Sequence, residues 1–127
     1  TGHLVFGTLH TTNAVRSIDR IIDVYPPKEQ EQIRSMVSES MRGVVCQQLI
    51  PRADSTGREP AVEIMFATPA VANIIREKKT FQLASVLQTG AKMGMITMED
   101  SLADLLRRGL ITREEARYRC ENPDRFK

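Results

Sequence analysis

Apolar positions along the first part of the chain predict a buried strand and two amphipathic helices. Residues 4–9 form a short apolar run bounded by polar residues, which is typical of a buried strand. Polar residues at 10–13 end this run, and their side chains can cap a following helix whose apolar face lies within residues 15–22. Across residues 27–46, apolar positions recur at three- and four-residue spacing, so the longest amphipathic helix is expected there.

The rest of the chain predicts a β-hairpin followed by short helices. Residues 48–66 contain two β-prone segments joined by a turn rich in Asp, Ser and Gly. In the second segment Val62, Ile64 and Phe66 alternate with their neighbours and are expected to form the drier face. Gly90 is expected to end a later helix in a left-handed conformation. Most of the helices have a threonine in position to cap them, and they are expected over residues 69–79, 80–89, 98–109 and 113–122.

These elements divide the chain into two parts. Residues 1–66 mix strands with helices, whereas residues 67–127 are helical. We therefore predict an α/β fold with a helical C-terminal subdomain. The chain begins at Thr1 without a methionine and enters an apolar strand pattern at once. We expect it to be a piece of a longer domain, whose separation would leave an unpaired sheet edge at its start.

Composition narrows the class of protein. The 127 residues are 41% hydrophobic and 27% charged, which suits one soluble domain or part of one. No apolar run reaches the roughly 18 residues of a membrane span, so none is expected. A formal net charge of +2 and an aromatic content of 5% do not favour nucleic-acid binding, although basic residues are in surplus within 107–127. Cys46 and Cys120 form no C-x-x-C motif, and two thiols suit a reducing compartment.

The polar residues at 8–13 form the main candidate site. They follow a predicted strand and precede a helix N-terminus, where open α/β folds bind ligands and where backbone N–H groups attract anions. His10 can donate a hydrogen bond to a phosphate or orient an attacking water. The alternative is that His10 and its threonine neighbours only cap the helix. His3 lies an odd number of residues from His10, so the two would face opposite sides of a strand and no metal site is expected.

Two further groups of charged residues allow more than one interpretation. Arg20 can bind an oxyanion across a subunit boundary, although an ion pair within its own helix is the simpler interpretation. The charged run 76–79 follows Ile74 and Ile75, and it either compensates the helix dipole or, if the isoleucines are exposed, marks a docking surface. The sequence contains no G-x-x-x-x-G-K-[ST] phosphate loop and no nucleophile–base arrangement, so the chain alone does not define an enzyme.

Several segments of the chain resemble the secretion and pilus motor ATPases. Residues 1–11, TGHLVFGTLHT, are similar to the His box of that family, and residues 17–26, SIDRIIDVYP, are similar to the segment that follows it. Glu63-Ile64 and residues 68–77, TPAVANIIRE, resemble the motif of the type IV pilus retraction ATPases, the PilT family. Residues 88–98 fit the C-terminal region of the same family. The resemblance extends over essentially the whole chain.

This resemblance implies the C-terminal portion of a RecA-like P-loop ATPase core followed by a small helical subdomain. The complete protein would be a homo-hexamer that hydrolyses ATP with Mg²⁺ at subunit boundaries and powers pilus retraction and twitching motility. It would be cytoplasmic, peripheral at the inner face of the cytoplasmic membrane, and would act on the inner-membrane platform protein of the pilus. The phosphate loop, acidic box and Walker B glutamate of the family precede the His box. ATP and Mg²⁺ would therefore be bound mainly by residues missing from this chain, which alone is expected to be inactive.

The resemblance also assigns roles to individual residues. His10 would be catalytic and, with Thr11, would contact the terminal phosphate of the nucleotide. Ala72 stands where the family usually has arginine, which leaves the exact subfamily open. Two cysteines cannot form the four-cysteine zinc motif of the assembly ATPases, which favours retraction. The retraction motif corresponds to Ala70, Val71, Asn73, Ile74, Ile75, Arg76 and Glu77.

Three alternatives stay open. One is an ATPase of pilus assembly or type II secretion from the same superfamily. Another is a non-enzymatic nucleic-acid-binding module that uses the basic end of the chain, whose affinity would fall steeply with salt. The third is a passive helical adaptor that binds no nucleotide. A phosphate loop in the sequence before Thr1 would decide among these classes.

Overall fold

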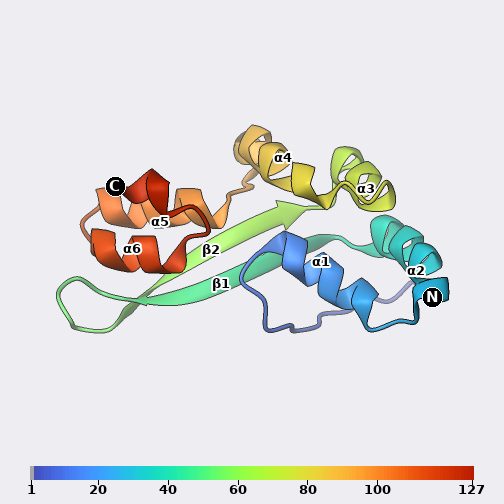
Figure 1. Ribbon diagram of the computed structural model, residues 1–127, viewed down its shortest axis with the longest axis horizontal. Coiled ribbons are helices and arrows are strands. Elements are labelled where there is room, and N and C mark those ends of the chain that lie inside the picture. The colour runs from blue at the N-terminus through green and yellow to red at the C-terminus, as the bar shows by residue number, and fades with distance from the viewer. Residues whose placement is uncertain (1) are drawn as a thin grey trace.

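The computed structural model describes residues 2–127 and shows a long antiparallel β-hairpin with helices packed along it (Figure 1). Strands β1 (Gly43–Pro51) and β2 (Arg58–Phe66) pair over their whole lengths. Helices α1 (Ala14–Asp23) and α2 (Pro27–Ser40) precede the hairpin. The elements that follow it are α3 (Pro69–Arg76), α4 (Leu83–Thr89), α5 (Met98–Arg107) and α6 (Arg113–Arg119), with 3-10 turns at Thr80–Gln82, Gly90–Met93 and Pro123–Phe126. None of the helices within residues 2–127 has the length and apolar character that crossing a membrane requires.

The predicted hairpin is confirmed, and its first strand begins earlier than expected. The assignment of residues 43–46 to a helix is wrong, because these residues open β1. Helix α2 ends at Ser40, since the next residue takes an extended backbone with ψ of 139°. The β-branched pair Val44–Val45 then lies opposite residues 64–65 of β2. Apolar residues at this spacing suit either a helix or a strand, and pairing with β2 decides between them.

The prediction of a strand at residues 4–9 is also wrong for this chain. The segment forms no strand, and its apolar side chains are exposed, with Phe6 at 89% and Val5 at 80%. A strand needs a neighbour to satisfy its backbone hydrogen bonds. Within residues 2–127 the only sheet is the two-stranded one formed by β1 and β2, and residues 4–9 do not join it.

The two sides of β2 face different surroundings, and the buried side is not the expected one. Ala61, Glu63 and Met65 are buried, whereas Val62 and Ile64 are only half-buried. The reason is that the helices at both ends of the strand pack on the side that carries Glu63. A charged side chain on the buried side of a strand requires hydrogen-bond partners.

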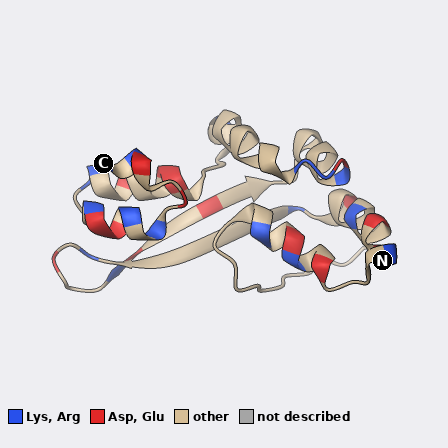
Figure 2. Cartoon of the chain, in the orientation of Figure 1, with Lys and Arg blue, Asp and Glu red and all other residues tan. Residues whose placement is uncertain are grey.

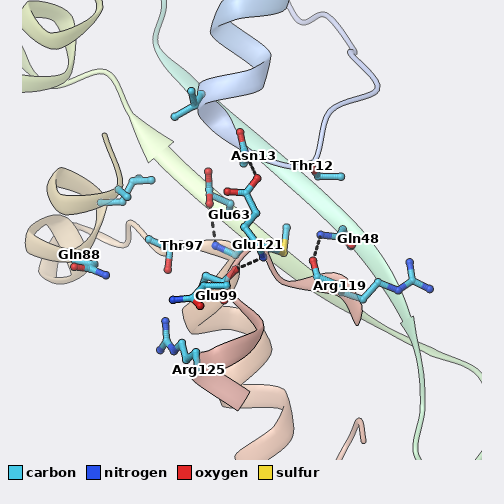
Figure 3. Close-up of a pocket in the computed structure, with 15 residues that line it drawn as sticks. Thr12, Asn13, Gln48, Glu63, Gln88, Thr97, Glu99, Arg119, Glu121 and Arg125 are labelled. Carbon is cyan, nitrogen blue, oxygen red and sulfur yellow. Dashed lines mark hydrogen bonds between the residues drawn. The ribbon is translucent and has the colours of Figure 1, made fainter. Parts of the chain in front are cut away.

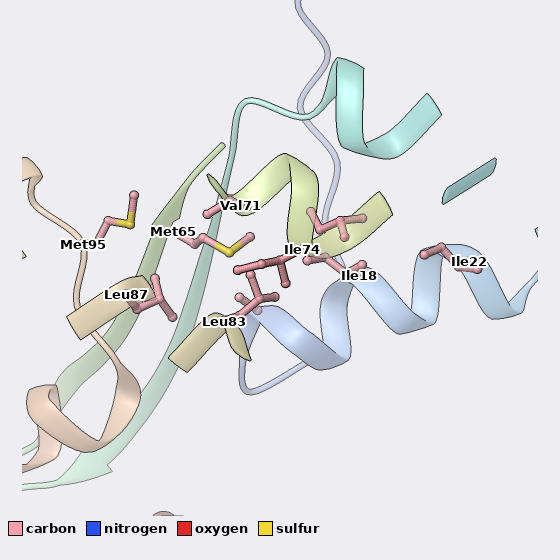
Figure 4. Packing of buried hydrophobic residues seen from close by; sticks show 10 residues of the cluster. Ile18, Ile22, Met65, Val71, Ile74, Leu83, Leu87 and Met95 are labelled. Atoms are coloured by element: carbon pink, nitrogen blue, oxygen red, sulfur yellow. The ribbon is translucent and has the colours of Figure 1, made fainter. Parts of the chain in front are cut away.

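Two hydrophobic clusters hold the helices on the hairpin. In the first cluster, helices that follow the hairpin pack on α1 and on β2, and in the second they pack on the hairpin itself. The first cluster lies where α1, α3 and α4 meet the end of β2 (Figure 4), and consists of Ala14, Ile18, Ile22, Met65, Val71, Ile74, Ile75, Leu83, Leu87 and Met95. The second holds α5 and α6, and consists of Cys46, Ile50, Ala61, Met98, Leu102, Leu105, Ile111, Ala116 and Phe126.

Side-chain caps begin α1, α3, α5 and α6, as the sequence predicts. In each case the side-chain oxygen accepts a hydrogen bond from a backbone N–H in the first turn. This satisfies one of the N–H groups that a helix start leaves without a partner. The capping residues are Asn13, Thr68, Thr97 and Thr112.

Gly90 ends α4, but the predicted left-handed conformation is wrong. Its φ is −83°, which any residue can adopt. A Cβ at this position would lie 2.7 Å from the Met95 sulfur. Gly90 is therefore required by the close approach of Met95, which is itself buried.

Candidate functional site

The loop before α1 is held by hydrogen bonds to the first turns of that helix. Asn13 caps α1 by accepting the Arg16 backbone N–H at 2.8 Å. The hydroxyl oxygens of Thr11 and Ser17 lie 2.6 Å apart, and Ser17 Oγ donates to the Asn13 carbonyl at 3.0 Å. His10 is exposed at the start of this loop. The predicted placement of residues 10–13 before a helix N-terminus is confirmed.

His10, Thr11 and Arg20 line one surface hollow, although the sequence indicated Arg20 separately from the other two. The hollow lies between the loop and one side of α1. Imidazole, hydroxyl and guanidinium groups, which can donate hydrogen bonds to an oxyanion, therefore line the same hollow. The remaining lining residues are Thr12, Arg16, Asp19, Asp23 and Val24.

Two charged residues of this hollow, Asp19 and Arg20, have unusual surroundings: the pKa of Asp19 is raised, and Arg20 forms no ion pair among residues 2–127. Burial raises the pKa of the Asp19 carboxyl, and the Asp23 carboxylate raises it further, while Arg34 acts in the opposite direction. The ion pair within α1, the simpler interpretation for Arg20, is not formed. Its guanidinium pairs with no carboxylate among residues 2–127. Arg20 is exposed and accessible to an anion.

Glu63 connects the hairpin to two helices. It is only 7% exposed, and its Oε2 accepts the Met98 N–H at 2.9 Å (Figure 3). Its Oε1 accepts the Ala14 N–H at 2.7 Å. Ala14 and Met98 are the first residues of α1 and α5, so one carboxylate serves two positive helix ends. No role of its own is predicted for Glu63 from the sequence, where it is only part of the family resemblance. The available signal was a glutamate that alternates with Ala61 and Met65 along a strand.

A cavity of about 410 Å³ lies beside Glu63, lined by residues of α1, α4, α5 and the C-terminal segment (Figure 3). Glu121 of that segment reaches the start of α1. Its Oε1 accepts a hydrogen bond from Asn13 Nδ2 at 2.6 Å and pairs with Arg16 at 3.4 Å. The Glu121 N–H donates to Glu99 at 2.6 Å. The end of the chain is thereby tied to the helix that follows the candidate loop.

Cys46 lies on β1 opposite Glu63 and is 3% exposed. Burial raises the pKa of its thiol; the nearby Glu63 carboxylate raises it too, whereas a contact with the Ser17 hydroxyl at 3.5 Å lowers it. A buried thiol with a raised pKa stays protonated at neutral pH. Cys46 therefore acts as a core side chain rather than a nucleophile.

The segment that resembles the retraction motif forms α3, and its residues divide between core and surface. Ile75 is fully buried and Ile74 is 9% exposed, so the condition for the docking-surface interpretation, exposed isoleucines, is not met. Asn73, Arg76 and Glu77 are exposed, and Arg76 Nη1 donates to Asn73 Oδ1 at 2.9 Å. The accessible part of this motif is therefore polar apart from Ala70. Of the other motif residues, the structure exposes Ala70 and buries Val71.

Within residues 2–127, no three His, Cys, Asp or Glu side chains gather as a metal ion would require. The donors at His10 and Thr11 suit a phosphate. They do not suit Mg²⁺, which prefers carboxylate and carbonyl oxygens. No Mg²⁺ site is assigned to the described residues.

Comparison with known proteins identifies the family to which this fold and the loop before α1 belong. The family model described as "Type II/IV secretion system protein" matches residues 1–119, and the chain belongs to this family. The fold is also similar to the crystal structure of the pilus retraction motor PilT with bound ADP, with a TM-score of 0.86 and 40% identity, over 98% of this chain and 34% of that chain. The predicted fold class, the C-terminal portion of such an ATPase, is confirmed.

Two relatives narrow the comparison to pilus retraction. The chain is 54% identical over 124 residues to a twitching motility protein of Neisseria gonorrhoeae, which covers 98% of this chain and 33% of that protein. It is 50% identical over 126 residues to the type IV pilus retraction ATPase PilT of Pseudomonas aeruginosa, over 99% of this chain and 36% of that protein. The resemblance to the retraction ATPases is thus confirmed. The chain spans about a third of the length of the proteins that it matches.

Proposed function

We propose that the complete protein is a hexameric motor ATPase that powers type IV pilus retraction, and that this chain is the C-terminal part of its motor domain. The observation that carries the proposal is the identity of 54% and 50% to proteins named for twitching motility and pilus retraction. These names also favour retraction over pilus assembly and type II secretion within the family. In this proposal the hexamer lies at the cytoplasmic face of the inner membrane and acts on the platform protein of the pilus.

In this proposal His10 and Thr11 contact the terminal phosphate of ATP. Their position supports the role, because both line the hollow between the loop and α1, and His10 is exposed there. Phosphoryl transfer is catalysed largely by positioning and charge stabilisation, which donors in this place supply. Arg20, in the same hollow, would reach the nucleotide of a neighbouring subunit. ATP and Mg²⁺ are held mainly by residues outside this chain, which alone is therefore inactive.

Loss of the terminal phosphate then lets the loop and the helices that follow it shift relative to the ATPase core. The hydrogen bonds from Thr11 and Asn13 to α1 support this, because they make the loop and the helix move as one unit. Residues 67–127 act as the output subdomain. The exposed polar side of α3, with Arg76 and Glu77, passes the shift to a neighbouring subunit or to the pilus machinery.

A histidine substitution in the complete protein tests the phosphate contact. His10→Ala should lower the kcat of ATP hydrolysis by about 100-fold, while the affinity for an ATP analogue and the hexameric assembly persist. His3→Ala is the matched control, since His3 lies in the same exposed segment and outside the hollow, and its kcat should stay at the unmodified value. Undiminished turnover of the His10→Ala protein would contradict the proposal.

A further inference from the structure

We propose that Glu63 is a positioning residue that transmits movement of the loop at His10 to the C-terminal helices. The inference rests on the proposed function, in which this loop responds to the terminal phosphate of ATP. Its basis is that one buried carboxylate holds the starts of two helices, α1 and α5, that lie on opposite sides of the hairpin in the sequence. A shift of one helix start must be accommodated at the other.

Glu63 is the only charged residue in the middle of the two paired strands (Figure 2). No residue of β1 is charged, and the other charges on β2, Arg58 and Glu59, lie at its start. Each oxygen of the Glu63 carboxylate accepts an N–H at the positive end of a helix. Hydrogen bonds to an ionised acceptor in buried surroundings are among the strongest in proteins. The joint therefore resists local deformation and can carry a displacement.

The two hydrogen bonds of Glu63 connect the proposed phosphate-binding loop, through α1, with the proposed output helices, through α5. Ala14 directly follows the loop whose Thr11 hydroxyl contacts Ser17 of the same helix. Met98 begins α5, which packs on β2 and on α6. Glu63 is thus the buried link between the loop and α5, beside the exposed contacts of Glu121 with Asn13 and with Glu99.

A second hydrogen bond between the hairpin and α5 offers a matched control. The Val62 N–H donates to Ser101 Oγ at 2.9 Å, and Ser101 is buried. This bond fastens α5 to β2 without reaching α1. Loss of the Ser101 hydroxyl should therefore weaken the attachment of α5 and leave its coupling to the loop intact.

The experiment compares amide hydrogen exchange of the complete protein with ADP and with a non-hydrolysable ATP analogue. In the unmodified protein, residues 14–17 and 98–101 should both change their exchange between the two nucleotides. Glu63→Gln keeps the shape of the side chain, but its amide offers one oxygen acceptor and one nitrogen donor, so one of the two helix starts loses its partner. In this variant the nucleotide response of residues 98–101 should be lost, while that of residues 14–17 persists.

Ser101→Ala should retain both responses, which separates coupling from a general weakening of α5. Glu63→Asp is one methylene shorter and too short to reach both amides, and it repeats the test if the glutamine variant does not assemble. A response of residues 98–101 that survives in the Glu63 variants overturns the inference. Absence of any response at residues 14–17 in the unmodified protein overturns the proposed function as well, and so distinguishes the two failures.

Discussion

The Oε1 atom of Glu63 accepts the backbone N–H of Ala14 at 2.7 Å across 49 residues of sequence. The bond joins the middle of β2 to the helix that follows the candidate phosphate-binding loop. The other oxygen of the same carboxylate holds Met98, so an N-terminal helix and a C-terminal helix share one buried charge. The stability of these elements is therefore expected to depend on a single side chain.

Removal of this carboxylate should destabilise the protein strongly. Glu63→Ala leaves two buried N–H groups without an acceptor, and each costs about 1–3 kcal/mol. We expect the free energy of unfolding to fall by about 3 kcal/mol, measured by urea denaturation of the complete protein. Glu31→Ala, at an exposed site on α2, serves as the control and should stay within about 0.5 kcal/mol. A fall below about 1 kcal/mol for Glu63→Ala would show that another acceptor replaces the carboxylate.

A methyl group at Gly90 should disturb the first hydrophobic cluster. Gly90→Ala places a Cβ within 2.7 Å of the Met95 sulfur, and overpacking of this kind costs about 1–3 kcal/mol. Met95→Ala in the same protein should relieve the clash, so the two substitutions should be non-additive in thermal or urea unfolding. Gly7→Ala is the control, because no heavy atom lies within 4 Å of its Cβ position. Strict additivity of the Gly90 and Met95 effects would refute the packing explanation.

The carboxyl of Asp19 should destabilise the fold when ionised, because its pKa is raised by burial and by Asp23. An acid with a higher pKa in the folded than in the unfolded state contributes stability at low pH that is lost as the pH rises. Asp19→Asn should therefore raise the free energy of unfolding at neutral pH, and the gain should shrink as the pH falls to about 4. Nucleotide-free urea unfolding across this pH range measures the effect.

Asp104→Asn is the matched comparison with the opposite sign. Hydrogen bonds and charge from Arg107 and Arg108 lower the pKa of the Asp104 carboxyl, so its ionised form favours the folded state. The substitution should reduce stability at neutral pH, and the difference should disappear as the pH falls. The same sign for both substitutions at neutral pH would contradict the assigned causes of the two shifts.

The exposed side of α3 should matter for retraction more than for hydrolysis. Arg76→Ala removes a surface contact with Asn73, so stability should change by no more than about 0.5 kcal/mol. Twitching motility should be lost, as it should with Glu77→Ala, while the ATP turnover of the purified complete protein is retained. Lys28→Ala, an exposed charge on α2, is the control and should preserve both activities. Equal loss of motility and turnover in the α3 variants would indicate a structural role for the motif.

The helix starts were predictable because a cap is a local interaction. The threonine or asparagine side chain bonds an N–H only a few residues away, so the residue types suffice to place it. The same locality placed His10 and Thr11 before a helix N-terminus. Their convergence with Arg20 follows from the helical periodicity, which brings that residue to the side of α1 that faces the loop.

Features that depend on distant partners could not be predicted in this way. Residues 43–46 satisfy a helical spacing, but pairing with β2 makes them a strand. Residues 4–9 have the composition of a strand, but they have no neighbour within residues 2–127 and stay exposed. In both cases the backbone hydrogen bonds that decide the outcome come from another element.

Local residue patterns suffice to predict the helix caps, the turn of the hairpin and the motifs that relate this chain to the pilus motor ATPases. Packing between distant elements sets which side of β2 is buried, why Gly90 is glycine and what Glu63 does. This is because a buried carboxylate acquires its role from the groups that surround it. The N–H groups of Ala14 and Met98 reach Glu63 only after α1 and α5 have packed on the hairpin.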